Sequence, residues 1–177
     1  LASWAEAAGD ARGDSLSGIE AIEGSNFDDV FLLTNLDDRG NGGGGNDRIE
    51  GRDGLDILKG LAGNDTLDGG LGIDTLEGGN GDDVLVYDAA DTLIDAGGGF
   101  DVLNINLAGV GGNFRVYFND PANGAGGITN DAGTQIQWTG IERVVFGGGD
   151  GSEAITGTNN NDTLSGGAGN DTLNGND

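Results

Sequence analysis

Carboxylate side chains recur every nine residues through the first half of this chain. Residues 15–86 divide into eight successive nonapeptides, and the sixth position of every one is acidic. These acids are Glu20, Asp29, Asp38, Asp47, Asp56, Asp65, Asp74 and Asp83. Oxygen-bearing, negatively charged side chains at such a regular spacing could bind hard cations, because Ca²⁺ takes its ligands from carboxylates and backbone carbonyls.

The composition excludes several other kinds of chemistry. The 177 residues include no His and no Cys, which rules out His-based triads, zinc sites, disulfides and thiol nucleophiles. The 31 acidic and 7 basic residues give a net charge of −24, which repels nucleic acid and anionic membranes. No apolar run approaches the roughly 20 residues that span a bilayer. We therefore expect no nucleic-acid partner and no direct membrane insertion.

The nine-residue period divides the chain into segments. One isolated unit lies at residues 96–104, and three more follow from residue 148, with acids at Asp101, Glu153, Asp162 and Asp171. Between the arrays, alternating stretches at 102–107, 113–118 and 134–138, and more loosely at 141–146, predict strands, which Gly-rich text such as 122–127 joins. The predicted segments are an edge segment at 1–14, a first repeat block at 15–86, an intervening β-strand block at 87–147 and a second repeat block at 148–177.

Each nonapeptide predicts a glycine-rich turn followed by a very short strand. The triplet at positions seven to nine has an apolar centre in seven of the eight units, and its neighbours point outward. A single triplet cannot form a core, but triplets stacked at about 4.8 Å per layer can. Two nonapeptides then make one coil, so residues 18 apart lie above one another.

This stacking places Asp47 over Asp65 and Asp65 over Asp83. Stacked carboxylates repel unless a positive charge lies between them, and the chain has only seven basic side chains. The pattern therefore predicts a ladder of several Ca²⁺ sites, and no other cofactor is expected. Mg²⁺ fits less well, because it retains its waters and requires octahedral geometry.

The units at 60–68 (GLAGNDTLD), 69–77 (GGLGIDTLE) and 166–174 (GGAGNDTLN) resemble the G-G-x-G-x-D-x-U-x repeat of RTX (repeats-in-toxin), or hemolysin-type, calcium-binding proteins. The resemblance implies an all-β fold, namely a right-handed parallel β-roll, or calcium-stapled solenoid, in two blocks that flank a non-repeat β segment. It also implies type I secretion, a location outside the cell or at its surface, and folding when the chain meets extracellular calcium.

The resemblance further implies ligand sets. In the family, carbonyls from positions two and four and the position-six Asp of one turn join carbonyls from positions one and three and the Asp of the stacked turn. The sets implied here are Gly43, Gly45 and Asp47 with Gly60, Ala62 and Asp65; Arg52, Gly54 and Asp56 with Gly69, Leu71 and Asp74; Leu61, Gly63 and Asp65 with Gly78, Asn80 and Asp83; and Gly149, Gly151 and Glu153 with Gly166, Ala168 and Asp171. Further candidate ligands are Asp29, Asp38, Asp101 and Asp162.

Two departures from the repeat affect these sets. The unit at 33–41 lacks the glycines of the turn and has Gly40 where an apolar residue belongs, which weakens a site between Asp38 and Asp56. No stacked unit is expected after Val86, so Asp74 and Asp83 are each expected to face one half-empty side.

These features predict a calcium-driven folding module with no catalytic activity of its own. The chain starts at Leu1 rather than Met, and we expect it to be a piece of a longer protein that carries any catalytic domain elsewhere. The expected partners are calcium ions, other domains of that parent protein and the type I secretion machinery. An enzyme would need two acids set apart in a cleft, and nothing in the sequence distinguishes such a pair.

The alternative is an adhesin segment or a polysaccharide-binding accessory module that contacts an extracellular glycan. Its best support is the clustering of Arg39, Arg48, Arg52 and Lys59 within the first array. The aromatic residues Phe114, Tyr117 and Trp138 could stack on sugars, although packing in the core of the intervening block is the favoured interpretation.

Overall fold

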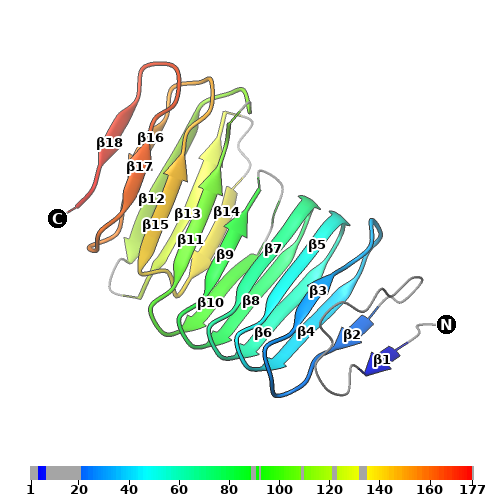
Figure 1. Cartoon of the computed structure of the whole chain (residues 1–177). Helices are drawn as coiled ribbons and strands as arrows, with labels where there is room; N and C mark the ends of the chain where they lie inside the picture. The colour runs from blue at the N-terminus through cyan, green and yellow to red at the C-terminus, as the bar shows by residue number, and fades with distance from the viewer. Residues whose placement is uncertain are drawn as a thin grey trace.

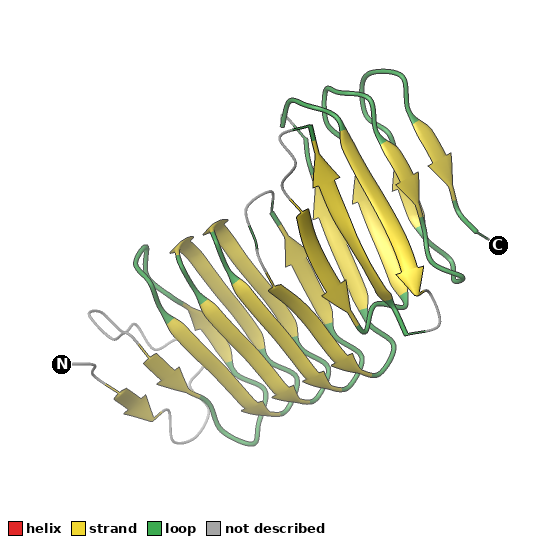
Figure 2. Ribbon diagram, turned by 180° about the vertical axis from the view of Figure 1, so that it is seen from behind, coloured by secondary structure: helices red, strands yellow, loops and turns green. Residues whose placement is uncertain are grey.

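The computed structural model describes residues 4–6, 21–88, 91, 93–108, 110–120, 123–131 and 135–176. Within these ranges the chain is built of strands, turns and loops without a helix, so no helix there could cross a membrane (Figure 2). Two sheets face each other along an elongated roll, with the two termini at opposite ends (Figure 1). The predicted all-β parallel β-roll is therefore confirmed.

The strands alternate between the two sheets. In spatial order, the eleven-stranded sheet contains β1 (Trp4–Glu6), β2 (Ala21–Glu23), β4 (Arg39–Gly44), β6 (Ile57–Ala62), β8 (Thr75–Asn80), β10 (Leu93–Gly98), β14 (Gln135–Thr139), β13 (Ala125–Asn130), β12 (Phe114–Asp120), β16 (Ala154–Thr156) and β18 (Thr172–Asn174). In the same manner, the seven-stranded sheet contains β17 (Thr163–Ser165), β15 (Arg143–Gly147), β11 (Val102–Asn106), β9 (Val84–Tyr87), β7 (Thr66–Gly72), β5 (Arg48–Gly54) and β3 (Val30–Leu32).

Parallel pairing at an interval of 18 residues generates the roll. In the seven-stranded sheet Ile49 pairs with Leu67, which pairs with Leu85, and in the opposite sheet Leu58 pairs with Leu76. All five side chains have no exposed surface, because position eight of each triplet points between the sheets. The nine-residue period of the sequence thus supplies one buried row for each sheet.

The roll continues beyond Val86, contrary to expectation. Strand β10 pairs with β8, with Ile94 beside Leu76, and β11 pairs with β9, with Leu103 beside Leu85. The isolated unit at 96–104 is therefore the next layer of the same stack. The expectation that Asp74 and Asp83 would face a half-empty side was wrong, since residues 93–95 form an inward-pointing triplet although the turn before them lacks the glycine pattern.

The intervening block adds unequal numbers of strands to the two sheets. The eleven-stranded sheet receives β14, β13 and β12, of which β13 runs antiparallel to both neighbours, whereas the seven-stranded sheet receives only β15. The four predicted stretches form β11, β12, β14 and β15, but β13 was missed because its glycines indicated a connection. Gly126 is buried in β13. Glycine is required at this position because a Cβ atom would lie 2.7 Å from Nε1 of Trp138 on β14.

Glycine at position four is required by the packing of one turn on the next. Gly63 has a φ of +129°, and a Cβ atom at this position would overlap the carbonyl oxygen of Gly45, one coil earlier. Gly72 has a φ of +151° and stands in the same relation to Gly54. Any side chain at these positions therefore meets both backbone strain and a steric clash.

The variant Gly63→Ala is expected to lower the free energy of unfolding by about 3 kcal/mol, because strain and overpacking each cost about 1–3 kcal/mol. Gly98→Ala is the matched control, because a Cβ atom at Gly98 meets nothing within 4 Å. Urea denaturation of both variants at saturating calcium measures the difference. Equal losses in the two variants would show that the close approach of Gly63 to Gly45 does not limit stability.

Candidate metal centre

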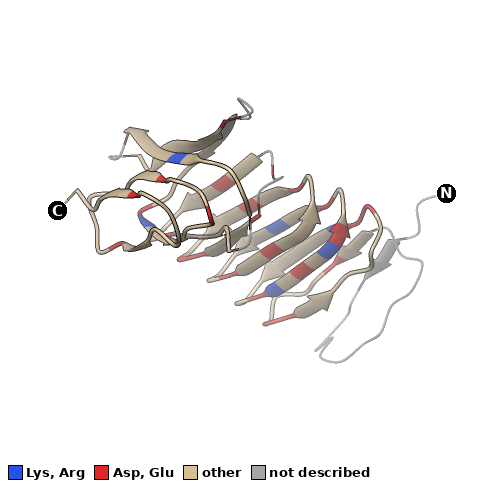
Figure 3. Cartoon of the chain, turned by 90° about the horizontal axis from the view of Figure 1, so that it is seen from above, with Lys and Arg blue, Asp and Glu red and all other residues tan. Residues whose placement is uncertain are grey.

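Buried aspartates stand in two columns at the starts of the stacked triplets. One column precedes strands of the seven-stranded sheet and contains Asp29, Asp47, Asp65, Asp83 and Asp101. The other precedes strands of the eleven-stranded sheet and contains Asp38, Asp56 and Asp74. All eight residues are at most 3% exposed, whereas Glu20 lies outside the described residues. Acidic residues accordingly recur along the turns of the roll (Figure 3).

After the first aspartate of each column, the preceding layer holds one carboxylate oxygen of every further aspartate. The backbone N–H of Asp47 donates to Oδ1 of Asp65 at 2.8 Å, and the N–H of Asp65 donates to Oδ1 of Asp83 at the same distance. The bond from Asp56 to Asp74 is identical, as are those that begin at Asp29, Asp38 and Asp83. The structure thus brings together both acids of the first three implied ligand sets.

The second carboxylate oxygen points into the turn. Oδ2 of Asp47, Asp56, Asp65, Asp83 and Asp101 is buried and has no hydrogen-bond partner within the described part of the chain. In the turns of Asp47, Asp56, Asp65 and Asp83, a glycine at position one leaves space for it. A Cβ atom on Gly60 would overlap Oδ2 of Asp65 and would lie 2.6 Å from the carbonyl oxygen of Gly78 in the next coil. Carboxylate and carbonyl oxygens therefore border the same small space.

Burial gives these carboxylates a high proton affinity. Desolvation is the main reason that the pKa of Asp47, Asp56 and Asp83 rises from 3.8 to about 6, while the carboxylates of neighbouring layers raise it further and the backbone N–H lowers it. Desolvation also raises the pKa of Asp101 to about 7, and it raises the pKa of Asp65. Buried anions without a countercharge fit a bound cation, which would supply that charge.

The basic side chains do not supply the countercharge. Arg48 pairs with Glu50, and Lys59 pairs with Glu77 at 2.6 Å, on the outer faces of the sheets. Neither ion pair involves an aspartate of the columns. No group of three or more acidic side chains that could hold a metal ion is found among the described residues. A cation here would therefore depend on stacked pairs of carboxylates together with backbone carbonyls.

The implied carbonyl ligands occupy different environments. The carbonyl of Ala62 accepts the N–H of Gly45 at 3.0 Å, and that of Asn80 accepts the N–H of Gly63 at 2.9 Å. Position-three carbonyls therefore already take part in turn-to-turn hydrogen bonds. Arg52 and Leu61 fill position two with a φ of +81° each, a left-handed conformation that usually requires glycine. Gly43, Gly70 and Gly79 occupy position two of other turns with a positive φ as well, so Arg52 and Leu61 keep the same turn geometry despite their side chains.

Position one supplies carbonyls beside the unpartnered oxygens. A Cβ atom on Gly51 would overlap Oδ2 of Asp56 and lie 2.5 Å from the carbonyl oxygen of Gly69. Gly78 has the same relation to Oδ2 of Asp83 and to the carbonyl of Ala96, one coil later. The carbonyls of Gly69, Gly78 and Ala96 therefore lie near the unpartnered oxygens of Asp56, Asp65 and Asp83, respectively.

The second repeat block reproduces the arrangement with greater exposure. The N–H of Glu153 donates to Oδ1 of Asp171 at 3.0 Å, and both carboxylate oxygens of Glu153 lack a partner in the described ranges. Desolvation, followed by the charge of Asp171, raises the pKa of Glu153. The carbonyl of Gly149 accepts the N–H of Ala168 at 3.0 Å. Asp171 itself is only half-buried, in the last layers of the roll.

In three turns the residue at position two donates hydrogen bonds to the aspartate of the same turn. Thr34, at position two, donates to Oδ2 of Asp38 through its N–H at 2.8 Å and its hydroxyl at 2.7 Å. Ser25 donates to Asp29 in the same manner, and Thr158 donates to both carboxylate oxygens of Asp162. The candidate ligands Asp29, Asp38 and Asp162 thus differ from the others, because a hydroxyl at position two contacts their carboxylates.

Two acids that the sequence analysis missed extend the columns. Glu142 accepts the N–H of Asp101 on Oε2 at 2.8 Å, and the triplet 143–145 that follows it has the inward-pointing centre of a repeat. Asp91 is 1% exposed and accepts the N–H of Asp88 on Oδ2 at 3.1 Å. Glu142 could have been found from the sequence, because it directly precedes an x-apolar-x triplet. Asp91 could not, because it stands one residue before position six of its nonapeptide.

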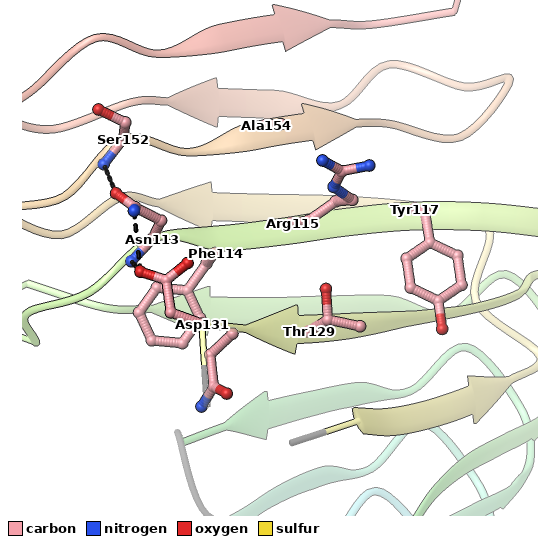
Figure 4. A pocket seen from close by; sticks show the side chains of 9 residues that line it. Asn113, Phe114, Arg115, Tyr117, Thr129, Asp131, Ser152 and Ala154 are labelled. Carbon is pink, nitrogen blue, oxygen red and sulfur yellow. Dashed lines mark hydrogen bonds between the residues drawn. The ribbon is translucent and has the colours of Figure 1, made fainter. Parts of the chain in front are cut away.

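A separate groove lies on the outer face of β12, β13 and β16 (Figure 4). It has a volume of about 510 Å³ and is lined by Asn113, Arg115, Tyr117, Thr129, Asp131 and Ser152, among others. Asn113 closes one end by accepting the N–H of Ser152 and donating to Asp131, both at 2.8 Å. Of the three aromatic residues considered for sugar stacking, Phe114 and Trp138 are buried in the core, as favoured, and Tyr117 is half-buried.

The four basic residues of the first array do not form one strip. Arg39 and Lys59 lie on the eleven-stranded sheet, Arg48 begins β5 in the seven-stranded sheet, and Arg52 stands at a turn position. These basic residues are close together in the sequence, but the fold distributes them over two sheets, which removes the support for glycan binding that their clustering gave.

Comparison with protein families identifies a repeat family whose model matches this chain. The family model of the RTX calcium-binding nonapeptide repeat matches four times, at residues 34–67, 41–76, 59–94 and 147–177, which together cover just over half of the chain. No curated protein matches the sequence. The matched ranges include every aspartate from Asp38 to Asp83 in the two columns, but they omit Asp101 and Glu142.

Proposed function

The chain belongs to the RTX calcium-binding nonapeptide repeat family, and we propose on this basis that it is a secreted module that folds when it binds extracellular calcium. The observation that carries the proposal is the row of buried, unpartnered Oδ2 atoms in successive layers. Bound Ca²⁺ would supply the positive charge that these oxygens lack. The residues that would hold it are the stacked pairs Asp47 with Asp65, Asp65 with Asp83, Asp56 with Asp74 and Glu153 with Asp171.

The coupling of folding to binding follows from the cost of the calcium-free roll. Glycine-rich turns lose much conformational entropy on folding, and the buried carboxylates of adjacent layers repel one another. An unfolded chain holds the same carboxylates apart in water, so it binds calcium weakly. Calcium therefore stabilises the folded state by mass action, and binding free energy becomes folding free energy.

We further propose that the module acts outside the cell, with calcium ions, the other domains of its parent protein and the type I secretion machinery as partners. It has no catalytic activity of its own in this proposal. The distribution of titratable acids supports this, because those whose pKa reaches about 6 or more, such as Asp47, Asp56 and Asp101, lie in or at the end of the columns. A paired-carboxylate active site would instead place two such acids in a cleft.

Calcium titration of the metal-stripped protein is expected to give a cooperative transition from coil to β structure in far-UV circular dichroism. Magnesium at the same concentrations should give no such transition, because it retains its waters and does not fit sites built from many carbonyls. A chain that is already folded in excess chelator would overturn the folding mechanism, although calcium could still bind to it.

A further inference from the structure

The column that contains Asp38, Asp56 and Asp74 ends at a residue outside the repeat motif. In the next layer the nonapeptide frame calls for an acid at position 92, and the sequence has Thr92. Strand β10 nevertheless continues the sheet, with Leu93 beside Thr75 and Ile94 beside Leu76. The acid nearest to the expected place is Asp91, one residue earlier in the chain.

Asp91 occupies the place of a column member despite this shift. Strand β10 pairs with β8, which puts Asp91 in the layer that follows Asp74. The N–H of Asp88 donates to Oδ2 of Asp91 at 3.1 Å. Oδ1 is buried and has no hydrogen-bond partner among the described residues, and the whole side chain is 1% exposed. After burial, the charge of Asp74 is among the causes that raise the pKa of Asp91, so the two carboxyl groups influence each other.

The groups around this pair are acidic. Desolvation is the main reason that the pKa of Asp91 rises to about 8, and the charges of Asp88 and Asp74 raise it further. Asp68 and Asp88 act on Asp74 in the same direction. Tyr87 is 2% exposed, and its pKa is raised by burial and then by Asp91 and Asp88. Two buried carboxyl groups in adjacent layers that raise each other's proton affinity need either a proton or a cation to offset their charge.

We propose that Asp91 and Asp74 together bind a divalent, oxygen-preferring cation, with Ca²⁺ as the ion expected outside the cell. This site closes the column at the layer where the nonapeptide repeat stops supplying an acid. It rests on the proposed function, since it assumes that the neighbouring layers also hold calcium. Its ligand Asp91 comes from the intervening block, so cation binding at this site joins the first repeat block to the strands that follow it.

The number of calcium ions bound per chain tests the site directly. Equilibrium dialysis of Asp91→Asn at saturating calcium should give one ion fewer than the wild type, with the β signal in circular dichroism retained. The amide keeps the size of the side chain and one acceptor oxygen, so the lost charge is the principal change. The matched control is Asp95→Asn, because Asp95 is an exposed acid on β10, four residues after Asp91, and its Oδ1 accepts the hydroxyl of Thr139 at 2.9 Å.

Terbium provides a second measurement that depends on location. Tb³⁺ replaces Ca²⁺ at oxygen-rich sites and emits light when a nearby aromatic side chain is excited, and Tyr87 is the aromatic residue beside this pair. Emission excited at the aromatic band should fall in both Asp91→Asn and Tyr87→Phe, and should remain in Asp95→Asn. Tyr87→Phe should bind the same number of calcium ions as the wild type.

Two different negative results separate this proposal from the proposed function. If the wild type binds no calcium and shows no transition, the calcium-folding mechanism fails and this site fails with it. If the wild type binds calcium but Asp91→Asn binds the same number of ions and gives the same terbium emission, only this site is overturned. Asp91 and Asp74 then share a proton, and the folded Asp91→Asn variant should be more stable than the wild type at neutral pH.

Discussion

The variant Asp65→Asn is expected to lose two calcium ions with a single substitution. Asp65 lies between Asp47 and Asp83, and it belongs to the ligand sets on both sides. An ion present at 100 times its dissociation constant stabilises the folded state by about 2.7 kcal/mol, so two ions contribute about 5 kcal/mol. Asparagine retains Oδ1 as an acceptor for the N–H of Asp47, which leaves the ladder hydrogen bond intact. The calcium midpoint of the folding transition should therefore rise strongly.

The control for this variant is Asp82→Asn, in the turn that contains Asp83. Asp82 also accepts a ladder hydrogen bond, from the N–H of Phe100 at 2.8 Å, but its side chain is exposed. The two substitutions remove the same charge, so only the buried position distinguishes them. Calcium titrations followed by circular dichroism should show a large shift for Asp65→Asn and a small one for Asp82→Asn. Equal shifts would mean that net charge, and not a shared ligand, sets the midpoint.

Metal-stripped protein is expected to gain structure on acidification, in contrast to the calcium-loaded protein. Burial raises the pKa of Asp47, Asp56 and Asp83 from 3.8 to about 6 in the folded chain. Each such rise corresponds to about 3 kcal/mol against the charged form. Holding several such carboxylates ionised therefore costs a large part of the stability of a typical domain, which is about 5–15 kcal/mol.

The direction follows from proton linkage. A carboxyl group with a raised folded pKa binds protons more tightly in the folded state, so its contribution to stability is fully present below about 3.8. This contribution declines as the pH rises and is lost above the folded pKa of about 6. The metal-stripped roll should therefore be more stable at pH 4.5 than at pH 7.5. Calcium binds the ionised carboxylates, so its affinity should fall as the pH drops below about 6.

Far-UV circular dichroism at several pH values, with and without excess calcium, measures both trends. The calcium should be removed by resin, because soluble chelators lose affinity in acid and would confuse the comparison. We expect β structure at mildly acidic pH without metal, and at neutral pH only with calcium. Metal-stripped protein that is more ordered at pH 7.5 than at pH 4.5 would contradict the electrostatic account.

Much of the fold follows from periodicity because one interval controls several features at once. The nine-residue spacing places Leu58 and Leu67 in opposite sheets and buries both, and it brings Asp47 and Asp65 into adjacent layers. These outcomes require only that each turn reverses the chain and each triplet pairs in parallel. The pairing of carboxylates could therefore be predicted before any side-chain geometry was known.

Other features depend on contacts that a linear pattern does not contain. Thr34 stands at position two in the sequence, yet its two hydrogen bonds to Asp38 arise only from the curvature of the turn. Asp91 reaches its column through a one-residue shift in a loop without the glycine pattern. Strand β13 has glycines that indicate a turn, but Gly126 is needed there because a side chain at this position would overlap the ring of Trp138.

The 18-residue pairing interval also restricts how such a chain can change its length during evolution. Duplication or loss of 18 residues within the repeats adds or removes one whole layer and leaves every later strand in its own sheet. A change of nine residues would transfer every later triplet to the opposite sheet. The strands β14, β13 and β12, which join only the eleven-stranded sheet, would then meet the wrong partner. Repeats before the intervening block should therefore be gained and lost in pairs.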